Sequence, residues 1–306
     1  MKNGQLQHLN PWQKIAIFFL MMLIGIILAS VVNQVLGAFL LESNSPFEIM
    51  NDLTRIDGIR MLKIGNFIVH LIAFILPTVA LAKAFNFEWK SAILFQKPKN
   101  SVFLWIPILF VLLTLLNEGL YLINHQIDFS FISGSLQETF EYRQSIQEKT
   151  IYAYIGGTWK SYFVNLFLIA LVPAISEELL FRGLIQNLFS KASQNVWIGI
   201  TISAILFALI HLQPFNFLPM FALAFCYGMI AAFTGSIWIT MILHFLNNAL
   251  TLSFEHFQRM FGWNDFDIPI SLSIGLILTS TVAIYLAIKT KKVSSKWFET
   301  KGVYLR

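Results

Sequence analysis

Three groups of polar residues lie inside apolar stretches of the second half of this chain. The first runs from Ser176 to Arg182 and contains two adjacent glutamates, the second ends in His211, and the third runs from His244 to Asn248. A formal charge at the centre of a bilayer costs about 2.5–3.5 kcal/mol on insertion scales, so ionisable residues at that depth usually serve a function. Carboxylates, imidazoles and amides are groups that activate water and stabilise an oxyanion, which indicates hydrolytic chemistry.

The two glutamates of the first group are predicted to have different roles. On an α-helix, Glu178 and Arg182 lie four residues apart on one face, where they can form an ion pair that neutralises both charges. Glu177 points about 100° away from Glu178 and is left without a local partner. A buried carboxylate of this kind suits the role of a general base that takes a proton from water.

The two histidine groups complete the predicted site. Helical rise places His211 level with Glu177, each about 21 Å from a turn expected at Ser190–Val196. His244 and Asn248 lie one turn apart on one helix face, where their N–H groups can stabilise an oxyanion. The alternative is metal-assisted hydrolysis, because Glu177, His211 and His244 match a zinc set of two histidines and one glutamate. No HExxH motif supports a metal, and both alternatives stay open at this point.

The composition identifies the surroundings of these groups as a lipid bilayer. Of the 306 residues, 57% are hydrophobic and only 12% are charged. The apolar runs of roughly 20 residues can cross the hydrocarbon core as helices, and they lack the alternation of a membrane barrel. We therefore predict an all-α polytopic membrane protein, a bundle of about eight transmembrane helices that forms a single domain over residues 1–306. The predicted spans are Ile15–Leu36, Ile64–Leu81, Val102–Ile123, Tyr162–Phe189, Trp197–His211, Phe217–Phe233, Ile237–Thr251 and Ile268–Ile288.

The distribution of basic residues predicts the orientation of these spans. Most of the 21 Lys and Arg residues fall on one side if both termini are cytoplasmic, and the positive-inside rule favours that arrangement. Residues 289–306 then form a basic cytoplasmic tail, and the first span is a retained anchor rather than a cleaved signal peptide. We expect an integral protein of the plasma membrane whose net charge of +5 reflects topology and not nucleic acid binding. The single cysteine, Cys226, excludes an intrachain disulfide and a cysteine-based metal cluster.

Taken together, the three groups resemble the motifs of the CPBP family of intramembrane proteases. The motifs are Glu177-Glu178-x-x-x-Arg182, Phe207-x-x-x-His211 and His244-x-x-x-Asn248, in that order on apolar helices. This family includes type II CAAX prenyl endopeptidases and bacteriocin-processing or immunity proteins. The resemblance implies an eight-helix bundle with a cavity open to the cytoplasm and a catalytic core over residues 160–251.

The resemblance also implies a role for each motif residue. Glu177 is expected to be the base, His211 its partner on the water, and His244 with Asn248 the oxyanion site. The supporting residues are Glu178, Arg182 and Phe207. The family has been regarded as metalloproteases, which keeps zinc as an alternative cofactor.

These observations predict an intramembrane endopeptidase that hydrolyses peptide bonds with a glutamate-activated water. A prenylated protein C-terminus or a peptide undergoing maturation would be its substrate and the lipid bilayer its surroundings, with the oligomeric state left open. The alternative is a non-catalytic bacteriocin immunity protein or a polytopic transporter that uses the polar cluster as a relay.

Other polar residues receive structural interpretations. His70 and Glu118 are predicted either to satisfy each other within the membrane or to line the outer part of a cavity. The segment Ser135–Thr150 is predicted to be a surface helix or a solvated connection. His125 and His256 are expected in flanks or loops without a role in the reaction.

Overall fold

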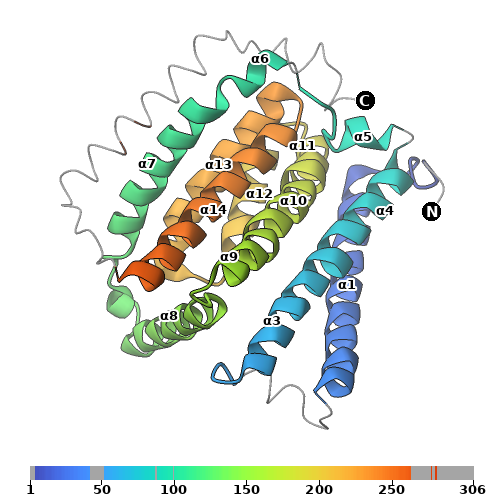
Figure 1. Ribbon diagram of the computed structural model, residues 1–306. Helices are drawn as coiled ribbons and strands as arrows, with labels where there is room; N and C mark the ends of the chain where they lie inside the picture. Colours follow the sequence, from blue (N-terminus) through green and yellow to red (C-terminus); the bar gives the residue numbers. More distant parts are fainter. Residues whose placement is uncertain are drawn as a thin grey trace. The chain divides into compact units, whose positions relative to one another are not determined.

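The computed structural model describes residues 4–41, 52–86, 88–98 and 100–262, together with residues 277 and 280. These residues form helices joined by turns and contain no strand, which confirms the all-α prediction (Figure 1). They divide into two compact units, described separately below. The first unit takes its described residues from Met1–Trp89, Ile146–Leu180 and His244–Asn264, and the second from Lys90–Ser145, Phe181–Leu243 and Asp265–Arg306. The single-domain organisation stays a prediction.

The first unit contains the N-terminal helices and the segment that carries the two glutamates. Its elements are α1 (Pro11–Leu40), α3 (Ile56–Val69), the π-helical η1 (His70–Ile75), α4 (Leu76–Phe85), the end of α8 (Gly134–Tyr154), α9 (Trp159–Asn165), the π-helical η3 (Leu166–Leu171), α10 (Val172–Glu178) and α14 (Trp238–Phe261) from His244 onward. Within it, α1 packs along α3, η1 and α4, and η1 also packs on α10 (Figure 1).

The second unit contains the remaining motif residues. Its elements are the end of α5 (Trp89–Ala92), α6 (Asn100–Phe103), α7 (Ile106–Asn124), the short η2 (Phe129–Phe131), most of α8, the π-helical η4 (Leu179–Ile185) from Phe181 onward, α11 (Gln186–Ser193), α12 (Val196–Ile210), the short η5 (Pro214–Asn216), α13 (Phe217–Thr234) and the start of α14. Here α12 packs between α11 and α13, and α13 also packs on α7.

The predicted spans before residue 260 coincide with helices. Among the residues that the structure describes, five helical stretches are long and apolar enough to cross a membrane, and Val196–Ile210 is a shorter apolar helix. The five are Pro11–Leu40, Ile56–Phe85, Asn100–Asn124, Trp159–Ser193 and Pro214–Thr234. The predicted span Ile268–Ile288 and the basic tail 289–306 lie outside the described residues. The chain is thus an integral, multi-pass membrane protein.

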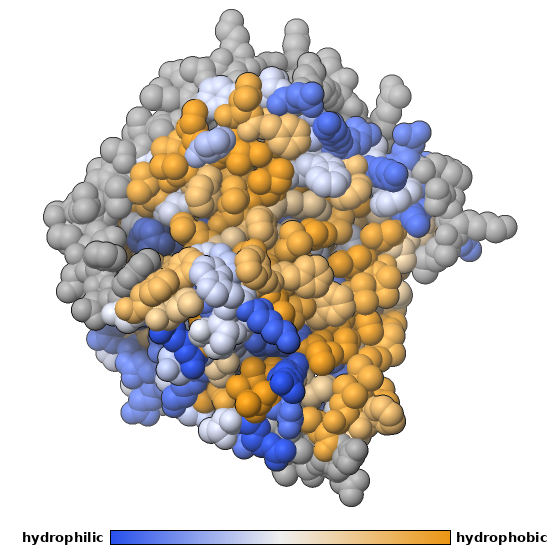
Figure 2. All heavy atoms as spheres, in the orientation of Figure 1, coloured by the Kyte–Doolittle hydropathy of each residue, from blue (hydrophilic) through white to orange (hydrophobic). Residues whose placement is uncertain are grey.

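The surface agrees with this assignment. Along α1, the apolar side chains of Leu20, Ile27, Val35 and Phe39 are each more than half exposed. Figure 2 shows broad apolar surface over the helices, with hydrophilic residues gathered toward the ends. A helix in water would bury such side chains, whereas a helix in lipid can expose them without cost.

Local capping explains why α1 begins before the predicted span. The side chain of Asn10 accepts a hydrogen bond from the backbone N–H of Gln13, and the Gln13 side chain accepts one from the backbone N–H of Asn10, both at 3.0 Å. Pro11 follows at the first helical position, where its missing N–H has no cost. These three residues extend the helix four residues ahead of Ile15.

Glycines allow helices to approach closely within each of the two units. A methyl group on Gly25 of α1 would lie 3.0 Å from the Cα of Ala73 in η1. In the second unit, a methyl group on Gly199 of α12 would lie 2.5 Å from the backbone carbonyl oxygen of Gln186 in α11. Small residues of this kind are how membrane helices gain packing contact without a hydrophobic driving force.

Candidate active site

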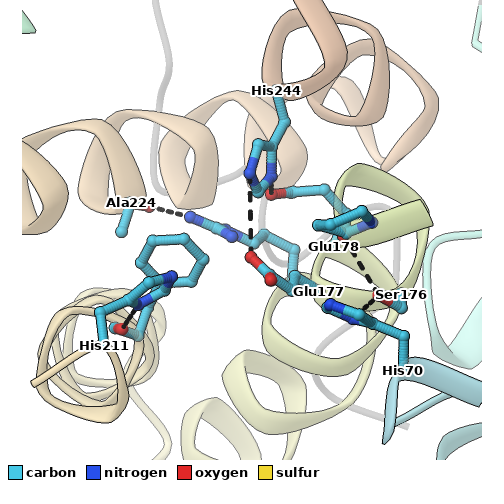
Figure 3. A network of polar contacts seen from close by, with 10 residues as sticks. His70, Ser176, Glu177, Glu178, His211, Ala224 and His244 are labelled. Atoms are coloured by element: carbon cyan, nitrogen blue, oxygen red, sulfur yellow. Dashed lines mark hydrogen bonds and ion pairs between the residues drawn. The ribbon is translucent and has the colours of Figure 1, made fainter. Parts of the chain in front are cut away.

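In the first unit, α10 and α14 bring both glutamates against one histidine. The His244 Nδ1 atom lies 3.0 Å from the Oε1 atom of Glu178, and the His244 Nε2 atom lies 3.8 Å from the Oε2 atom of Glu177 (Figure 3). All three side chains are buried, Glu178 completely so. The two carboxylates therefore approach opposite nitrogens of one imidazole ring, and only the contact with Glu178 is short enough for a direct hydrogen bond.

This arrangement determines which ring nitrogen of His244 carries a proton. An ionised carboxylate only accepts hydrogen bonds, so the Nδ1–H group donates to Glu178 when that side chain is charged. The Nε2 atom, on the side of Glu177, then carries a lone pair in the neutral ring or a second proton in the imidazolium. His244 can thus accept or donate a proton at the atom nearest Glu177, while Glu178 keeps the ring in place.

Asn248 lies one turn beyond His244 on α14, as the spacing predicts, and is half-buried. The described contacts give it no assigned partner in the first unit, so its oxyanion role stays a prediction.

A further hydrogen bond joins η1 to α10 directly beside Glu177. The Nδ1 atom of His70 lies 2.7 Å from the hydroxyl oxygen of Ser176, and both residues are buried (Figure 3). The prediction that His70 pairs with Glu118 is not tested, and Glu118 itself is exposed on α7, where it accepts a hydrogen bond from Asn117. Sequence reasoning missed Ser176, although its position next to Glu177 was a usable signal.

In the second unit, Arg182 is buried among aromatic rings. Its guanidinium lies 4.9 Å from the ring centre of Phe207 and 5.4 Å from that of Tyr227, and it donates a 3.0 Å hydrogen bond to the backbone oxygen of Ala224. Cation–π contacts become stronger away from water and offset part of the cost of burying a charge. These contacts agree with a supporting role for Arg182 and Phe207.

His211 directly follows the last residue of α12 in the same unit. Its contact also determines which ring nitrogen carries the proton. Its Nδ1 atom lies 2.7 Å from the backbone oxygen of Phe207. A carbonyl oxygen only accepts, so Nδ1 must carry the hydrogen, and Nε2 of the neutral ring is free to accept one. His211 therefore has the tautomer that a partner of the reacting water needs.

The connection that follows His211 is fixed by a buried asparagine. Asn124, at the end of α7, donates to the backbone oxygen of Pro214 at 3.0 Å and accepts from the backbone N–H of Leu218 at 2.6 Å. Leu212 has a φ of 53°, which few residues other than glycine adopt readily. The tie to Asn124 helps to hold this strained turn.

The predicted site residues thus fall into two sets. Glu177, Glu178 and His244 come together in the first unit, and Arg182, Phe207 and His211 belong to the second. The pairing of Glu178 with Arg182 and the approach of Glu177 to His211 stay predictions. His256, expected in a flank or a loop, lies in the part of α14 beyond the predicted span end at Thr251, and its side chain is fully buried.

A metal at this site finds little support in the arrangement of the side chains. Among the residues that the structure describes, no three His, Cys, Asp or Glu side chains are grouped so that they could hold a metal ion. Glu177 and His244 belong to the first unit and His211 to the second, so a zinc site formed by these three residues stays a prediction, and the Nδ1 atom of His244 already contacts Glu178. We derive no chemical step through a metal.

The fold and the site define a class: an integral, all-α membrane protein with a buried cluster of glutamate and histidine side chains on its apolar helices. Residues 159–250 match the family described as type II CAAX prenyl endopeptidase Rce1-like. The matched segment contains all three motifs, so the resemblance drawn from them is confirmed.

The chain is also similar to a curated protein of Bacillus subtilis (strain 168) named "Uncharacterized protein YpbD". The two are 28% identical over 102 residues, which cover 31% of this chain and 49% of that protein. The chain thus spans about half the length of the curated relative that it matches. No solved structure was found to match.

Proposed function

We propose that this protein is an intramembrane endopeptidase of the CAAX type in which Glu177 activates a water molecule. The observation that carries the proposal is the approach of two buried groups from separate helices, Glu177 Oε2 and His244 Nε2, to 3.8 Å. In this proposal both termini are cytoplasmic, the protein lies in the plasma membrane, and the cavity opens to the cytoplasm.

The distance between these two atoms suits a bridging water. Hydrogen bonds to water are about 2.8 Å long, so one water molecule can contact both atoms although they are too far apart to bond directly. A water held in this way has its proton directed at the carboxylate of Glu177. His244 restrains the water on its other side, and Glu178 restrains His244.

In the proposed reaction, Glu177 takes up one proton and later releases it, so that its carboxylate is regenerated. Glu177 takes a proton from the water as its oxygen attacks the carbonyl carbon of the scissile peptide bond. The carbonyl oxygen becomes an oxyanion, which the side-chain N–H of Asn248 and, in the imidazolium form, the Nε2–H group of His244 stabilise. The intermediate collapses as the carbon–nitrogen bond breaks, and Glu177 returns the proton to the leaving amine.

The test is cleavage of fluorogenic peptides by the full-length protein in lipid nanodiscs. One peptide carries a farnesylated CAAX terminus, and the other has the same sequence without the lipid. We expect Glu177→Gln to lower kcat by at least a hundredfold, because the amide cannot accept the proton of water. Glu118→Gln is the matched control: it makes the same chemical change at an exposed position on a transmembrane helix and should leave kcat within about twofold.

The result that would refute the proposal is equal cleavage by the wild type and Glu177→Gln. Protection of cells against a peptide toxin that survives Glu177→Gln would instead support the non-catalytic alternative. Addition of 1,10-phenanthroline, followed by zinc, tests metal dependence in the same assay. We expect the rate to be unchanged, whereas a loss that zinc restores would support the metal-dependent reaction.

A further inference from the structure

The hydrogen bond between His70 and Ser176 lies outside the three motifs, yet it joins the residue next to Glu177 to a different helix. Ser176 and Glu177 are consecutive on α10, so their side chains leave the helix about 100° apart. Any rotation of Ser176 about the helix axis therefore turns the carboxylate of Glu177 by the same angle.

The hydroxyl of Ser176 has two neighbours that together favour one arrangement of protons. Its oxygen lies 2.7 Å from the Nδ1 atom of His70 and 3.2 Å from the backbone oxygen of Pro173. A carbonyl oxygen can only accept, so both contacts are satisfied when His70 donates through Nδ1–H and the hydroxyl donates to Pro173. His70 then contacts α10 as a fixed donor.

The ring of His70 is itself held in place. It is the first residue of the π-helical η1 and packs edge-on against Phe74, with ring centres 5.3 Å apart. Gly25 of α1 fits closely against the backbone of Ile72 and Ala73 in the same turn. The ring contact and the close packing of the η1 backbone both restrict His70. A restrained side chain can fix the position of the helix that it contacts, whereas a mobile side chain cannot.

The regular α-helical segment that receives this contact is short. α10 is only seven residues long and lies between the π-helical η3 and η4. At each junction the regular ladder of backbone hydrogen bonds changes its spacing, and such turns often occur at functional sites. A hydrogen bond from a neighbouring helix therefore has more influence on the rotation of α10 than it would have on a long regular helix.

We propose that His70 is a positioning residue for the reaction: through Ser176 it sets the rotation of α10 and hence the direction of the Glu177 carboxylate. This inference rests on the proposed function for its kinetic consequence, although the geometric consequence can be measured without any activity. His70 itself touches neither the water nor the substrate.

A serine beside a histidine at 2.7 Å also has the geometry of a nucleophile and its base. Two features oppose that role here. Ser176 is fully buried, so a substrate carbonyl has no access to its oxygen, and its proton has a second acceptor in Pro173. Labelling with a fluorophosphonate decides the matter: modification of Ser176 would overturn the positioning role.

The kinetic experiment compares His70→Leu, His70→Asn and Ser176→Ala with the wild type on the farnesylated peptide. Displacement of a catalytic group by about 1 Å can cost a hundredfold in rate. We expect His70→Leu and Ser176→Ala to lower kcat at least tenfold with little change in KM. The amide N–H of His70→Asn can replace Nδ1–H, so this variant should recover most of the loss. Ser253→Ala removes a serine hydroxyl that contacts Tyr162 elsewhere in the first unit, and it should leave kcat unchanged.

The geometric experiment uses the Glu177→Cys/His244→Cys double substitution in a Cys226→Ala background. Dibromobimane bridges two thiols that face each other, and its rate reports whether positions 177 and 244 oppose. We expect His70→Leu to slow bridging at least fivefold and His70→Asn to restore it. If the wild type cleaves neither peptide, the proposed function fails and this rate alone decides the inference. A bridging rate that is equal with His70 and with leucine at position 70 would overturn it.

Discussion

The close contact of Gly199 in α12 with α11 makes a sharp prediction for Gly199→Ala. The added methyl group would overlap the hydroxyl of Ser190 and lie 2.5 Å from the backbone oxygen of Gln186. Ordinary contact begins at about 3.4 Å, so α11 and α12 must move apart by about 1 Å. A backbone atom cannot turn aside as a side chain can, which means that the whole helix pair has to shift.

The loss of stability can be estimated from the dispersion contacts between α11 and α12 that this shift weakens. A gap of 0.5–1 Å forfeits about a quarter to a half of each dispersion contact, and overpacking in cores typically costs about 1–3 kcal/mol. Because α12 is packed along α11 for its first turns, we expect Gly199→Ala to cost about 3 kcal/mol. Gly228→Ala, which meets the tip of the Gln186 side chain at 2.8 Å, should cost less because that side chain can move.

The assay is unfolding of the purified protein in mixed detergent micelles, followed by tryptophan fluorescence. The control is Gly134→Ala, since a methyl group there meets nothing within 4 Å and should be neutral or slightly stabilising. Adding Ser190→Ala to Gly199→Ala should restore only part of the stability, because the contact with Gln186 remains. Equal stability of Gly199→Ala and Gly134→Ala would refute the reasoning.

Two further predictions concern groups outside the proposed reaction. Asn124→Leu leaves the backbone groups of Pro214 and Leu218 without their hydrogen bonds and should lower the free energy of unfolding by about 2–4 kcal/mol, measured in the same micelles. Burial raises the pKa of Tyr154 to about 12, so the folded protein retains this proton where the unfolded chain has lost it. Its contribution to stability should be complete below pH 10 and be lost as the pH rises toward 12. Tyr154→Phe should remove that part of the alkaline decrease, and an unchanged decrease would contradict the assignment.

The helices could be predicted from the sequence because their signal is local. About twenty consecutive apolar residues have few structures open to them in lipid, so composition alone located each described span. Residue depth was also informative, since it selected Glu177 and His244, which lie together in the first unit. The ends were less accurate: capping by Asn10 starts α1 early, and α14 continues to Phe261, well past the predicted end at Thr251.

The pairing of polar residues is harder to predict from their spacing where a helix contains π turns. The spacing rule that pairs Glu178 with Arg182 assumes a regular α-helix, but Leu179–Ile185 is π-helical. Each π turn holds one extra residue and rotates the faces that follow it. A π turn also begins at His70, and no sequence pattern indicated the neutral hydroxyl of Ser176 as a partner of this histidine.

The free-energy cost of burying charged side chains explains why the charged residues of this site are contacted by groups from other helices. Glu177 and Glu178 at the end of α10 and Arg182 in η4 belong to one continuous helical stretch, Trp159–Ser193. Each of these side chains is buried, and each has groups from another helix close to it: His244 for the glutamates, and Phe207, Tyr227 and Ala224 for the arginine. Because an isolated charge in lipid is so unfavourable, contacts that make it tolerable also restrict where it points. The contacts that make a buried carboxylate at Glu177 tolerable therefore also restrict its direction. His70 contacts the neighbouring Ser176 on the same helix, so we expect a change at His70, outside the motifs, to alter kcat.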